Sequence, residues 1–304
     1  CYVPGGNYPL YSTALMLATP AKAAGVKRIT ACSPVVRGTG HINAKTLVAM
    51  DLAGVDEIYA LGGAQAIAAL AFGTASVPKV DKIVGPGNIY VALAKKAVYG
   101  YVSIDSIAGP SEILVIADET ANPRYVAADL LSQAEHDELA SAILVTTSEK
   151  LAGEVQKEIE GFTQVLSRKA IIEKSLENYG HILIASSIDE AVEIANAIAS
   201  EHLEIVTANP FEVMTKIRNA GAIFIGENSS EPLGDYFAGP NHILPNGTAK
   251  FFSPLSVDDF VKKSRIIYYS REALAAKKDD IIQFAKAESL TAHANSIAVR
   301  FEDK

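Results

Sequence analysis

Cysteine is scarce in this sequence. Only Cys1 and Cys32 carry a thiol among 304 residues, so the chain cannot build a disulfide framework, and no CxxC pair is present to bind a metal through thiolates. A reducing compartment, the cytoplasm, is therefore the expected location. Cys32 follows Ile29, Thr30 and Ala31, and we interpret it as a small buried hydrophobic residue rather than a nucleophile.

Positive charge is also in short supply, and long hydrophobic runs are missing. Lys and Arg number 27 against 35 Asp and Glu, with no basic stripe of the kind that neutralises phosphates, so we expect no nucleic-acid partner. The uncharged stretch 58–78 contains Gln65 and is interrupted by glycines, whereas a transmembrane helix needs about 20 strongly apolar residues. We expect no membrane segment and a soluble protein.

The first residues also lack the features of a secretory signal. The segment 1–6 has no initiator Met, no basic region and no apolar core. We interpret residue 1 as a position inside a longer protein rather than as its first residue.

What is present is an alternation of short β-branched runs with Ala-rich stretches. The hydrophobic fraction of 49% is enough for one large or two medium domains. Helical stretches such as 13–24, 64–72 and 188–200 separate the runs, an order typical of parallel α/β sheets. The predicted strands are 28–30, 57–61, 82–84, 113–116, 142–145, 182–184, 204–206 and 222–225.

A Gly/Pro junction at 108–111 divides this pattern into two α/β units. After about residue 255 the strand rhythm ends, and the sequence becomes charged and helical. We therefore expect an α/β protein with two domains, 1–110 and 111–255, followed by a helical tail, 256–304.

Two pairs of neighbouring residues are candidates for chemistry. Gln133 and His136 are three apart on a predicted helix and could hold one metal, although a solvated polar helix end explains that spacing as well. Glu201 and His202 are adjacent where a helix, opened by the capping box 187–190, turns into a strand. A carboxylate and an imidazole can supply a base and an acid near neutral pH, and a surface helix cap is the alternative.

Two Gly-rich segments complete the candidates. The loop 233–242 follows a predicted strand and contains Asp235 and His242, and loops at the ends of parallel strands commonly carry the site. A network of turns could use the same residues. The segment 85–88 has the tight turn of a dinucleotide site but lacks the third glycine of GxGxxG.

Taken in order along nearly the whole chain, nine motifs resemble those of the histidinol dehydrogenase family. They are YVPGG at 2–6, GGAQA at 62–66, GPGN at 85–88, AGPSE at 108–112, DLLSQAEH at 129–136, EHL at 201–203, GDY at 234–236, NHILP at 241–245 and LTAH at 290–293.

The resemblance implies a reaction and two cofactors. It implies oxidation of L-histidinol through L-histidinal to L-histidine, with two NAD reduced in succession, as the last steps of histidine biosynthesis. It also implies two Rossmann-like parallel-sheet domains and one Zn²⁺ per site. The implied metal ligands are Gln133, His136, Asp235 and His293. Nitrogen and oxygen ligands suit zinc, and leave room for the amine and imidazole of the substrate.

The resemblance also distributes the other roles. His202 would take the alcohol proton as hydride leaves, and Glu201 would activate water on the aldehyde. Ser111 and Glu288 would contact the substrate together with His202 and the metal ligands. NAD would be contacted by Tyr2, Gln65 and Asn88, which explains the missing GxGxxG.

Family resemblance further implies an intertwined homodimer. Domain 1–110 would contact NAD, domain 111–255 would carry most of the zinc site, and the tail 256–304 would complete the site of a partner subunit through Glu288 and His293. The family usually carries a substantial region before the motif at 2–6, so we expect the first domain to be incomplete here.

Two other functions compete with this interpretation. A zinc hydrolase could use the same metal ligands and Glu201 without a nicotinamide, but Gln65 and Asn88 would then have no role. A catalytically silent fragment that binds zinc or a partner is the second rival, against which stands the presence of every expected active-site residue.

Overall fold

The computed structural model describes residues 1–5, 10–107, 109–239, 243–245 and 247–302. The chain divides into two compact units, Cys1–Val261 and Lys262–Lys304, which are described separately below. Every pair of strands among the described residues is parallel. The prediction of an α/β protein with parallel sheets is therefore confirmed.

The larger sheet of the first unit has five strands in the order β7-β6-β5-β8-β9. The chain starts at the central strand β5, moves outward to β7, and then crosses back to β8 on the other side of β5. Strands β5 and β8 are therefore neighbours although two strands separate them in sequence. The strands are β5 (Glu112–Ala117), β6 (Ser141–Thr146), β7 (Gly180–Ile184), β8 (His202–Val206) and β9 (Ala222–Ile225).

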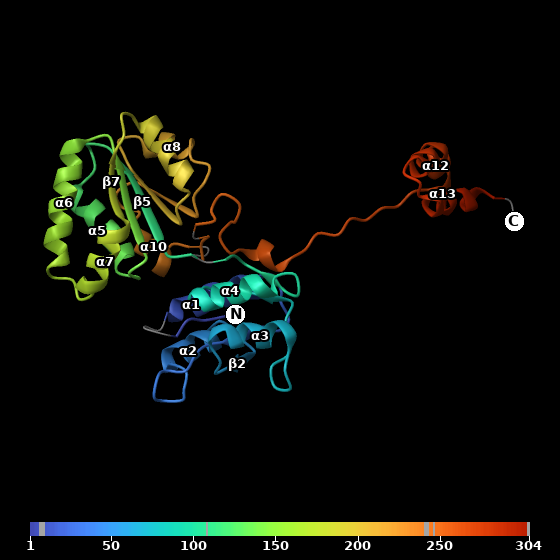
Figure 1. Ribbon diagram of the computed structural model, residues 1–304, viewed down its shortest axis with the longest axis horizontal. Coiled ribbons are helices and arrows are strands. Elements are labelled where there is room, and N and C mark those ends of the chain that lie inside the picture. Colours follow the sequence, from blue (N-terminus) through green and yellow to red (C-terminus); the bar gives the residue numbers. More distant parts are fainter. Residues whose placement is uncertain (6–9, 108, 240–242, 246, 303–304) are drawn as a thin grey trace. The chain divides into compact units, whose positions relative to one another are not determined.

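Helices cover both faces of this sheet, with α5, α6 and α7 on one side and α8 on the other (Figure 1). Successive residues of β5 point to opposite faces of the sheet. Ile113 packs with α5 and α6, whereas Leu114 packs with α8. Burial on both faces explains the continuous apolar run of this strand. The helices are α5 (Pro123–Ala134), α6 (Glu149–Thr163), α7 (Lys169–Tyr179), α8 (Ile188–Ile198), α9 (Pro210–Met214) and α10 (Glu231–Tyr236).

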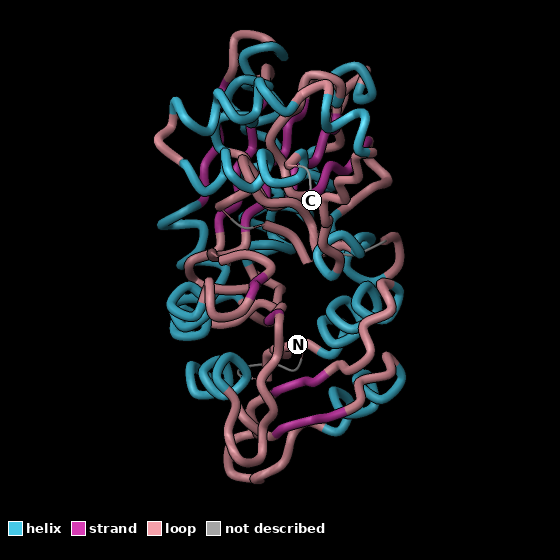
Figure 2. The backbone as a smooth tube through the Cα atoms, turned by 90° about the vertical axis from the view of Figure 1, so that its right-hand side faces the viewer, coloured by secondary structure: helices cyan, strands magenta, loops and turns pink. Residues whose placement is uncertain are grey.

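The preceding part of the first unit contains two short parallel pairs, β1 (Thr30–Cys32) with β2 (Glu57–Tyr59) and β3 (Lys82–Ile83) with β4 (Ser103–Ile104). The first residues of the chain lie between these pairs. Cys32 N donates to Cys1 O at 2.9 Å, and Tyr2 N donates to Val84 O at 2.8 Å. Figure 2 shows these strands as a group distinct from the five-stranded sheet. The helices here are α1 (Tyr11–Ala23), α2 (Ala44–Leu52), α3 (Gly63–Phe72) and α4 (Ile89–Val98).

Several local predictions differ in detail from the structure. The first strand begins at Thr30 rather than at residue 28, because Ile29 N donates to the side chain of Asp56 at 2.8 Å. The capping box at α8 is half formed: Ser187 Oγ accepts from Glu190 N at 3.2 Å, but the Glu190 carboxylate accepts from Ser186 N. Cys32 is completely buried, as expected.

The second unit is helical, as its sequence predicts. Its elements are α11 (Arg271–Ala275), α12 (Lys278–Ala287), α13 (Thr291–Ala298) and a 3₁₀ turn, Val299–Phe301. Ala285 and Ala294 are buried where α12 and α13 pack together. None of the helices that the structure describes, in either unit, combines the length and apolar character needed to cross a bilayer.

Candidate active site

A cavity of about 130 Å³ in the first unit collects residues that are far apart in the sequence. Its lining also includes Gly85 and Pro86 from the Gly-rich turn. All six site residues predicted between positions 111 and 235 line it: Ser111, Gln133, His136, Glu201, His202 and Asp235.

The cavity lies at the edge of the five-stranded sheet where the strands begin. Strands β5 and β8 start at Glu112 and His202, and α5 ends at Ala134, beside Gln133 and His136. Parallel α/β proteins more often place their site at the opposite edge, after the strands. Here the short turns that lead into neighbouring strands bring the polar groups together.

The sequence predicts that Asp235 lies in a loop, and the structure shows that it lies in a helix instead. Residues 231–236 form the short helix α10, with Pro232 in its first turn, and α10 contacts α5. This packing brings Asp235, which follows β9 in the sequence, into the lining of the cavity. Pro240, Asn241 and His242 of the same predicted loop lie outside the described residues.

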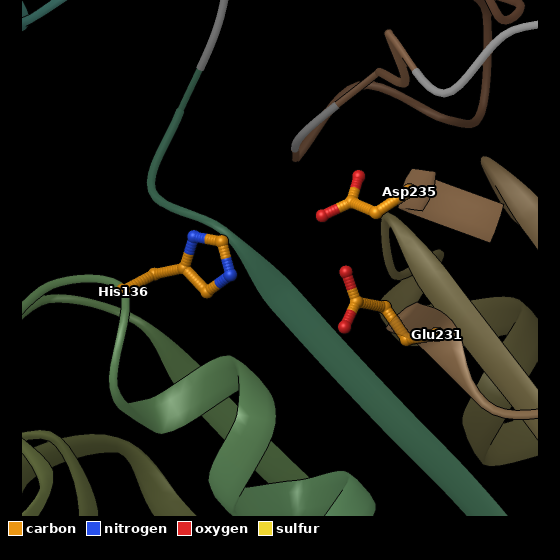
Figure 3. Close-up of side chains that lie close together, drawn as sticks. All are labelled: His136, Glu231 and Asp235. Atoms are coloured by element: carbon orange, nitrogen blue, oxygen red, sulfur yellow. The ribbon is translucent and has the colours of Figure 1, made fainter. Parts of the chain in front are cut away.

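Three side chains form a cluster that could hold a metal ion. The imidazole of His136 faces the carboxylates of Glu231 and Asp235 (Figure 3), and their potential ligand atoms lie within 4.8 Å of one another. Glu231 is only 3% exposed. The sequence does not predict Glu231 as a ligand, because nothing distinguishes it there from an ordinary exposed acidic residue.

Gln133 adds an amide to this wall of the cavity. Its side chain is 1% exposed, and Oε1 has no hydrogen-bond partner among the described residues. A buried acceptor without a donor is costly, and a cation would satisfy it. Gln133 and His136 do not share a helix, because α5 ends at Ala134 and His136 lies in the following turn, where His136 N donates to Gln133 O at 3.1 Å.

The protonation of this cluster follows from its burial. Burial raises the pKa of Glu231 to about 8, and the nearby charge of Asp235 adds to the increase. Burial lowers the pKa of His136, although Asp235 and Glu135 oppose the shift. A neutral imidazole is the form that binds metals. Amide oxygen, imidazole and carboxylates together form a donor set that fits Zn²⁺, with no thiolate required.

Two further carboxyls, those of the buried Glu204 and the half-buried Asp129, interact with Glu231. Glu231 N donates to Glu204 Oε1 at 2.9 Å, and Ser132 Oγ donates to Glu231 Oε2 at 3.3 Å. Burial raises the pKa of Glu204 well above its ordinary value and that of Asp129 to about 6. Glu204 interrupts the apolar run of β8, and that interruption was the one sequence signal that could have revealed it.

His202 is 3% exposed and held in one tautomer. Its Nδ1 lies 2.9 Å from the carbonyl oxygen of Glu112 and 3.6 Å from Glu201 Oε2. A carbonyl oxygen only accepts, so Nδ1 must carry a hydrogen. The basic nitrogen of the neutral ring is therefore Nε2.

Glu201 occupies the turn between α8 and β8 and is 7% exposed. Its Oε2 accepts from Glu112 N at 3.1 Å. Burial raises the pKa of Glu201 well above its ordinary value, and the charges of Glu112 and Glu231 contribute in the same direction. The structure supports the predicted corner: α8 ends at Ile198, and both side chains reach the cavity because neither belongs to a regular helix.

The predicted NAD residues lie in the preceding part of the first unit. Tyr2 is buried, and its hydroxyl accepts from Gly63 N at 3.1 Å at the start of α3. Gln65 is exposed in the first turn of α3, and Asn88 caps α4 by accepting from Val91 N at 3.1 Å. Helix starts that follow strands are suited to phosphate groups.

Glu288 and His293 belong to the second unit. Glu288 follows α12, His293 lies in α13, and both side chains are exposed within that unit. Their contribution to a metal and substrate site remains a prediction.

The fold and the cavity together define an α/β protein with a buried Glu–His pair beside a candidate metal site. Comparison with known proteins identifies its kind. A model of the histidinol dehydrogenase family matches residues 1–301. The histidinol dehydrogenase of Caldanaerobacter subterraneus subsp. tengcongensis is 64% identical over 301 residues, which are 99% of this chain and 70% of that protein.

Two further proteins agree with this match. The histidinol dehydrogenase of Clostridium acetobutylicum is 62% identical over 302 residues, covering 99% of this chain and 70% of that protein. A crystal structure of histidinol dehydrogenase from Elizabethkingia anophelis superposes with a TM-score of 0.93 at 43% identity, over 98% of this chain and 69% of that one.

The chain belongs to the histidinol dehydrogenase family, as its motifs predicted. Members of this family are NAD-dependent oxidoreductases, and the chain is an enzyme of this class, a dehydrogenase of histidine biosynthesis. Membership favours a dehydrogenase over the zinc hydrolase that the site residues alone left open.

Proposed function

We propose that this protein oxidises L-histidinol through L-histidinal to L-histidine, with zinc as its metal and two NAD as successive oxidants. The observation that carries the proposal is the convergence of Glu201 and His202 with Gln133, His136 and Asp235 on one cavity. In a member of the histidinol dehydrogenase family, this combination matches an alcohol and aldehyde oxidation better than a hydrolysis.

The proposed zinc ligands are Gln133, His136, Asp235 and His293, the last from the tail of a second subunit. The unpartnered Oε1 of Gln133 and the neutral imidazole of His136 support this assignment. Zinc, when bound, would hold the amine and imidazole of the substrate and act there as a Lewis acid. Glu231, beside Asp235, is an additional carboxylate that could support the metal ligands.

In the first oxidation, His202 acts as the base. Its Nε2 takes the proton of the substrate hydroxyl while the carbinol carbon gives its hydride to NAD, which leaves the aldehyde. The imidazolium that forms keeps its Nδ1–H bonded to the Glu112 carbonyl at 2.9 Å, so the ring does not have to reorient.

In the second oxidation, Glu201 acts on water. Its carboxylate takes a proton from the water that adds to the aldehyde carbon. The resulting hydrate then gives a second hydride to a second NAD while His202 takes its hydroxyl proton, which leaves the carboxylate. The raised pKa of Glu201 makes its carboxylate a stronger base than an exposed one. One acid/base pair in fixed geometry can thus serve both oxidations.

The remaining assignments complete the proposal. Ser111 lines the cavity and would contact the substrate, together with Glu288 from the tail. Tyr2, Gln65 and Asn88 would contact NAD. We further propose the domains 1–110, 111–255 and 256–304, with tail exchange in a homodimer. A cytoplasmic location would suit the free thiols of Cys1 and Cys32.

A single assay tests the reaction. The full-length protein is loaded with zinc and mixed with L-histidinol and NAD, and NADH absorbance is followed. Two NADH per substrate support the proposal. Absence of NADH from the zinc-loaded protein contradicts it, and zinc binding without turnover would indicate a catalytically silent protein.

Variants of the acid/base pair test the division of roles. His202→Asn should slow both oxidations by about 10²- to 10⁴-fold, the usual worth of a general base, whereas Glu201→Gln should mainly slow oxidation of L-histidinal. Starting the reaction from each substrate separates the steps. His181→Asn and Glu193→Gln, at exposed positions of β7 and α8, are matched controls. Equal losses in both steps for Glu201→Gln would contradict the assigned roles.

A further inference from the structure

Glu112, the first residue of β5, meets both members of the acid/base pair through its backbone. Its N–H donates to Glu201 Oε2 at 3.1 Å, and its carbonyl accepts from His202 Nδ1 at 2.9 Å. The parallel register, which pairs Ile113 with His202, produces these contacts. Any residue at this position could make them, so they do not explain a carboxylate here.

The Glu112 side chain makes two additional contacts, both through one oxygen. Oε2 accepts from Glu201 N at 3.3 Å and from Gly247 N at 3.1 Å. Gly247 has a φ of +64°, a left-handed conformation suited to glycine. The carboxylate therefore connects the turn at Gly247 with the corner that carries Glu201.

Ile243 and Leu244, which precede Gly247 in the sequence, line the cavity. Glu112 touches the backbone at the corner before β8 and at Gly247. Reciprocal bonds between Glu112 and Glu201, each accepting the backbone N–H of the other, restrict the Glu201 carboxyl to one orientation.

We propose that Glu112 is a positioning residue, whose side chain clamps the Gly247 turn to the Glu201–His202 corner and so aims the Glu201 carboxyl at the reacting carbon. The inference rests on the proposed function for the role of Glu201. The clamp depends on an acceptor oxygen rather than on the negative charge, because Glu112 Oε2 accepts both hydrogen bonds.

Three substitutions of Glu112 separate a requirement for the acceptor oxygen from a requirement for the negative charge. Glu112→Gln keeps an acceptor oxygen at the same distance from the backbone, so it should retain the clamp. Glu112→Asp keeps the charge but is shorter by one methylene, and Glu112→Ala removes the acceptor, so both should lose the clamp. Glu193→Ala, at an exposed position of α8, is the control for loss of a glutamate.

The kinetic experiment uses the full-length zinc-loaded protein with L-histidinal and NAD. We expect Glu112→Ala and Glu112→Asp to lower kcat by roughly 10- to 100-fold, with KM within about threefold, because a misplaced base costs rate more than binding. Glu112→Gln and Glu193→Ala should stay within about threefold of the unmodified protein. Full kcat in the Asp variant, or a Gln variant as slow as the Ala variant, would overturn the proposal.

Amide hydrogen exchange provides a readout that does not depend on turnover. Exchange at Gly247 and Glu201 should be faster in the Ala and Asp variants and unchanged in Gln. Equal exchange in all variants would overturn the clamp. If the unmodified protein produces no NADH, the proposed function fails, and the exchange comparison alone then decides whether the clamp exists.

Discussion

Two groups of buried charged residues border the same cavity, and the chain neutralises them differently. One is the ion pair of Lys95 and Asp105, and the other is the acidic cluster of Asp129, Glu204 and Glu231. Asp105 and Glu231 both line the cavity. The ion pair joins one positive and one negative side chain, whereas all three side chains of the acidic cluster are carboxyls.

The ion pair holds the turn before α4. Lys95 is 1% exposed and donates to Asp105 and, at 2.8 Å, to Gly85 O. Asp105 Oδ2 accepts from Gly85 N at 2.6 Å. Gly85 has a φ of +128°, and an added Cβ would lie 2.2 Å from Tyr2 O, so only glycine fits. The chain's own charges and backbone therefore hold the turn that leads to Asn88.

The side chains of the acidic cluster cannot neutralise one another, because all of them are carboxyls. Burial disfavours the ionised carboxyls, and each additional charge raises the pKa of the others. Protons can neutralise the cluster, and so can a cation bound beside Glu231. The comparison teaches that the fold alone neutralises the charges of one wall of the cavity, whereas the other wall needs protons or, under the proposed function, a bound cation.

Breaking the ion pair should have the largest effect on stability. Lys95→Met leaves the carboxylate of Asp105 buried without its cation, which should lower the free energy of unfolding by about 3–5 kcal/mol. The neighbouring Lys96→Met is a matched control, because Lys96 is exposed on the same helix and should change stability by less than about 0.5 kcal/mol. Urea unfolding of both variants measures the difference, and similar losses would contradict the interpretation.

Metal addition should act on the other wall. Zinc at a free concentration 100 times its Kd should raise the free energy of unfolding by about 2.7 kcal/mol over the chelator-treated protein. Gln133→Leu should weaken zinc binding by about tenfold or more, because it removes the buried acceptor.

Unfolding with and without zinc checks both statements. Lys95→Met should retain the full zinc increment, because the ion pair lies outside the metal cluster. A Gln133→Leu variant with unchanged zinc affinity would exclude Gln133 as a ligand.

The acidic cluster should also make the stability of the metal-free protein depend on pH. The pKa values of Asp129 and Glu231 in the fold are about 6 and about 8, raised from 3.8 and 4.5. Their protonated forms are thus favoured by folding, and this stabilisation is present below pH 4 and is lost as pH rises through 6 and then 8. Stability should fall over that range.

Glu204→Gln should flatten this profile by removing one buried charge while keeping an acceptor for Glu231 N. We expect a gain of about 1–2 kcal/mol at pH 8 and little change at pH 5. Urea unfolding of metal-free protein across pH measures it, with the exposed Glu193→Gln as control. A gain of equal size at both pH values would show that the cluster does not hold the protons assigned to it.

The local elements were predictable where one face, or both, is buried along a continuous run. Strand β5 was predicted within one residue at each end, because buried parallel strands are rich in β-branched residues. Strand β9 was predicted with the bounds it has, although it lies at the edge of the sheet and none of its residues is fully buried. Strand β4 was not predicted, because its two residues, Ser103 and Ile104, do not belong to a continuous β-branched run. The turn of His136 beyond α5 was also missed, because nothing in DLLSQAEH marks where the helix ends.

The sequence by itself determined the parallel α/β class, the family and the residues that could carry chemistry, since these depend on periodicity and on ordered motifs. Only the tertiary structure decided where the site lies, which nitrogen of His202 is basic, and that Glu231 and Glu204 join the cluster. The physical reason is strand order: β5 pairs with β8, so that Glu112 and His202, 90 residues apart, share a hydrogen bond.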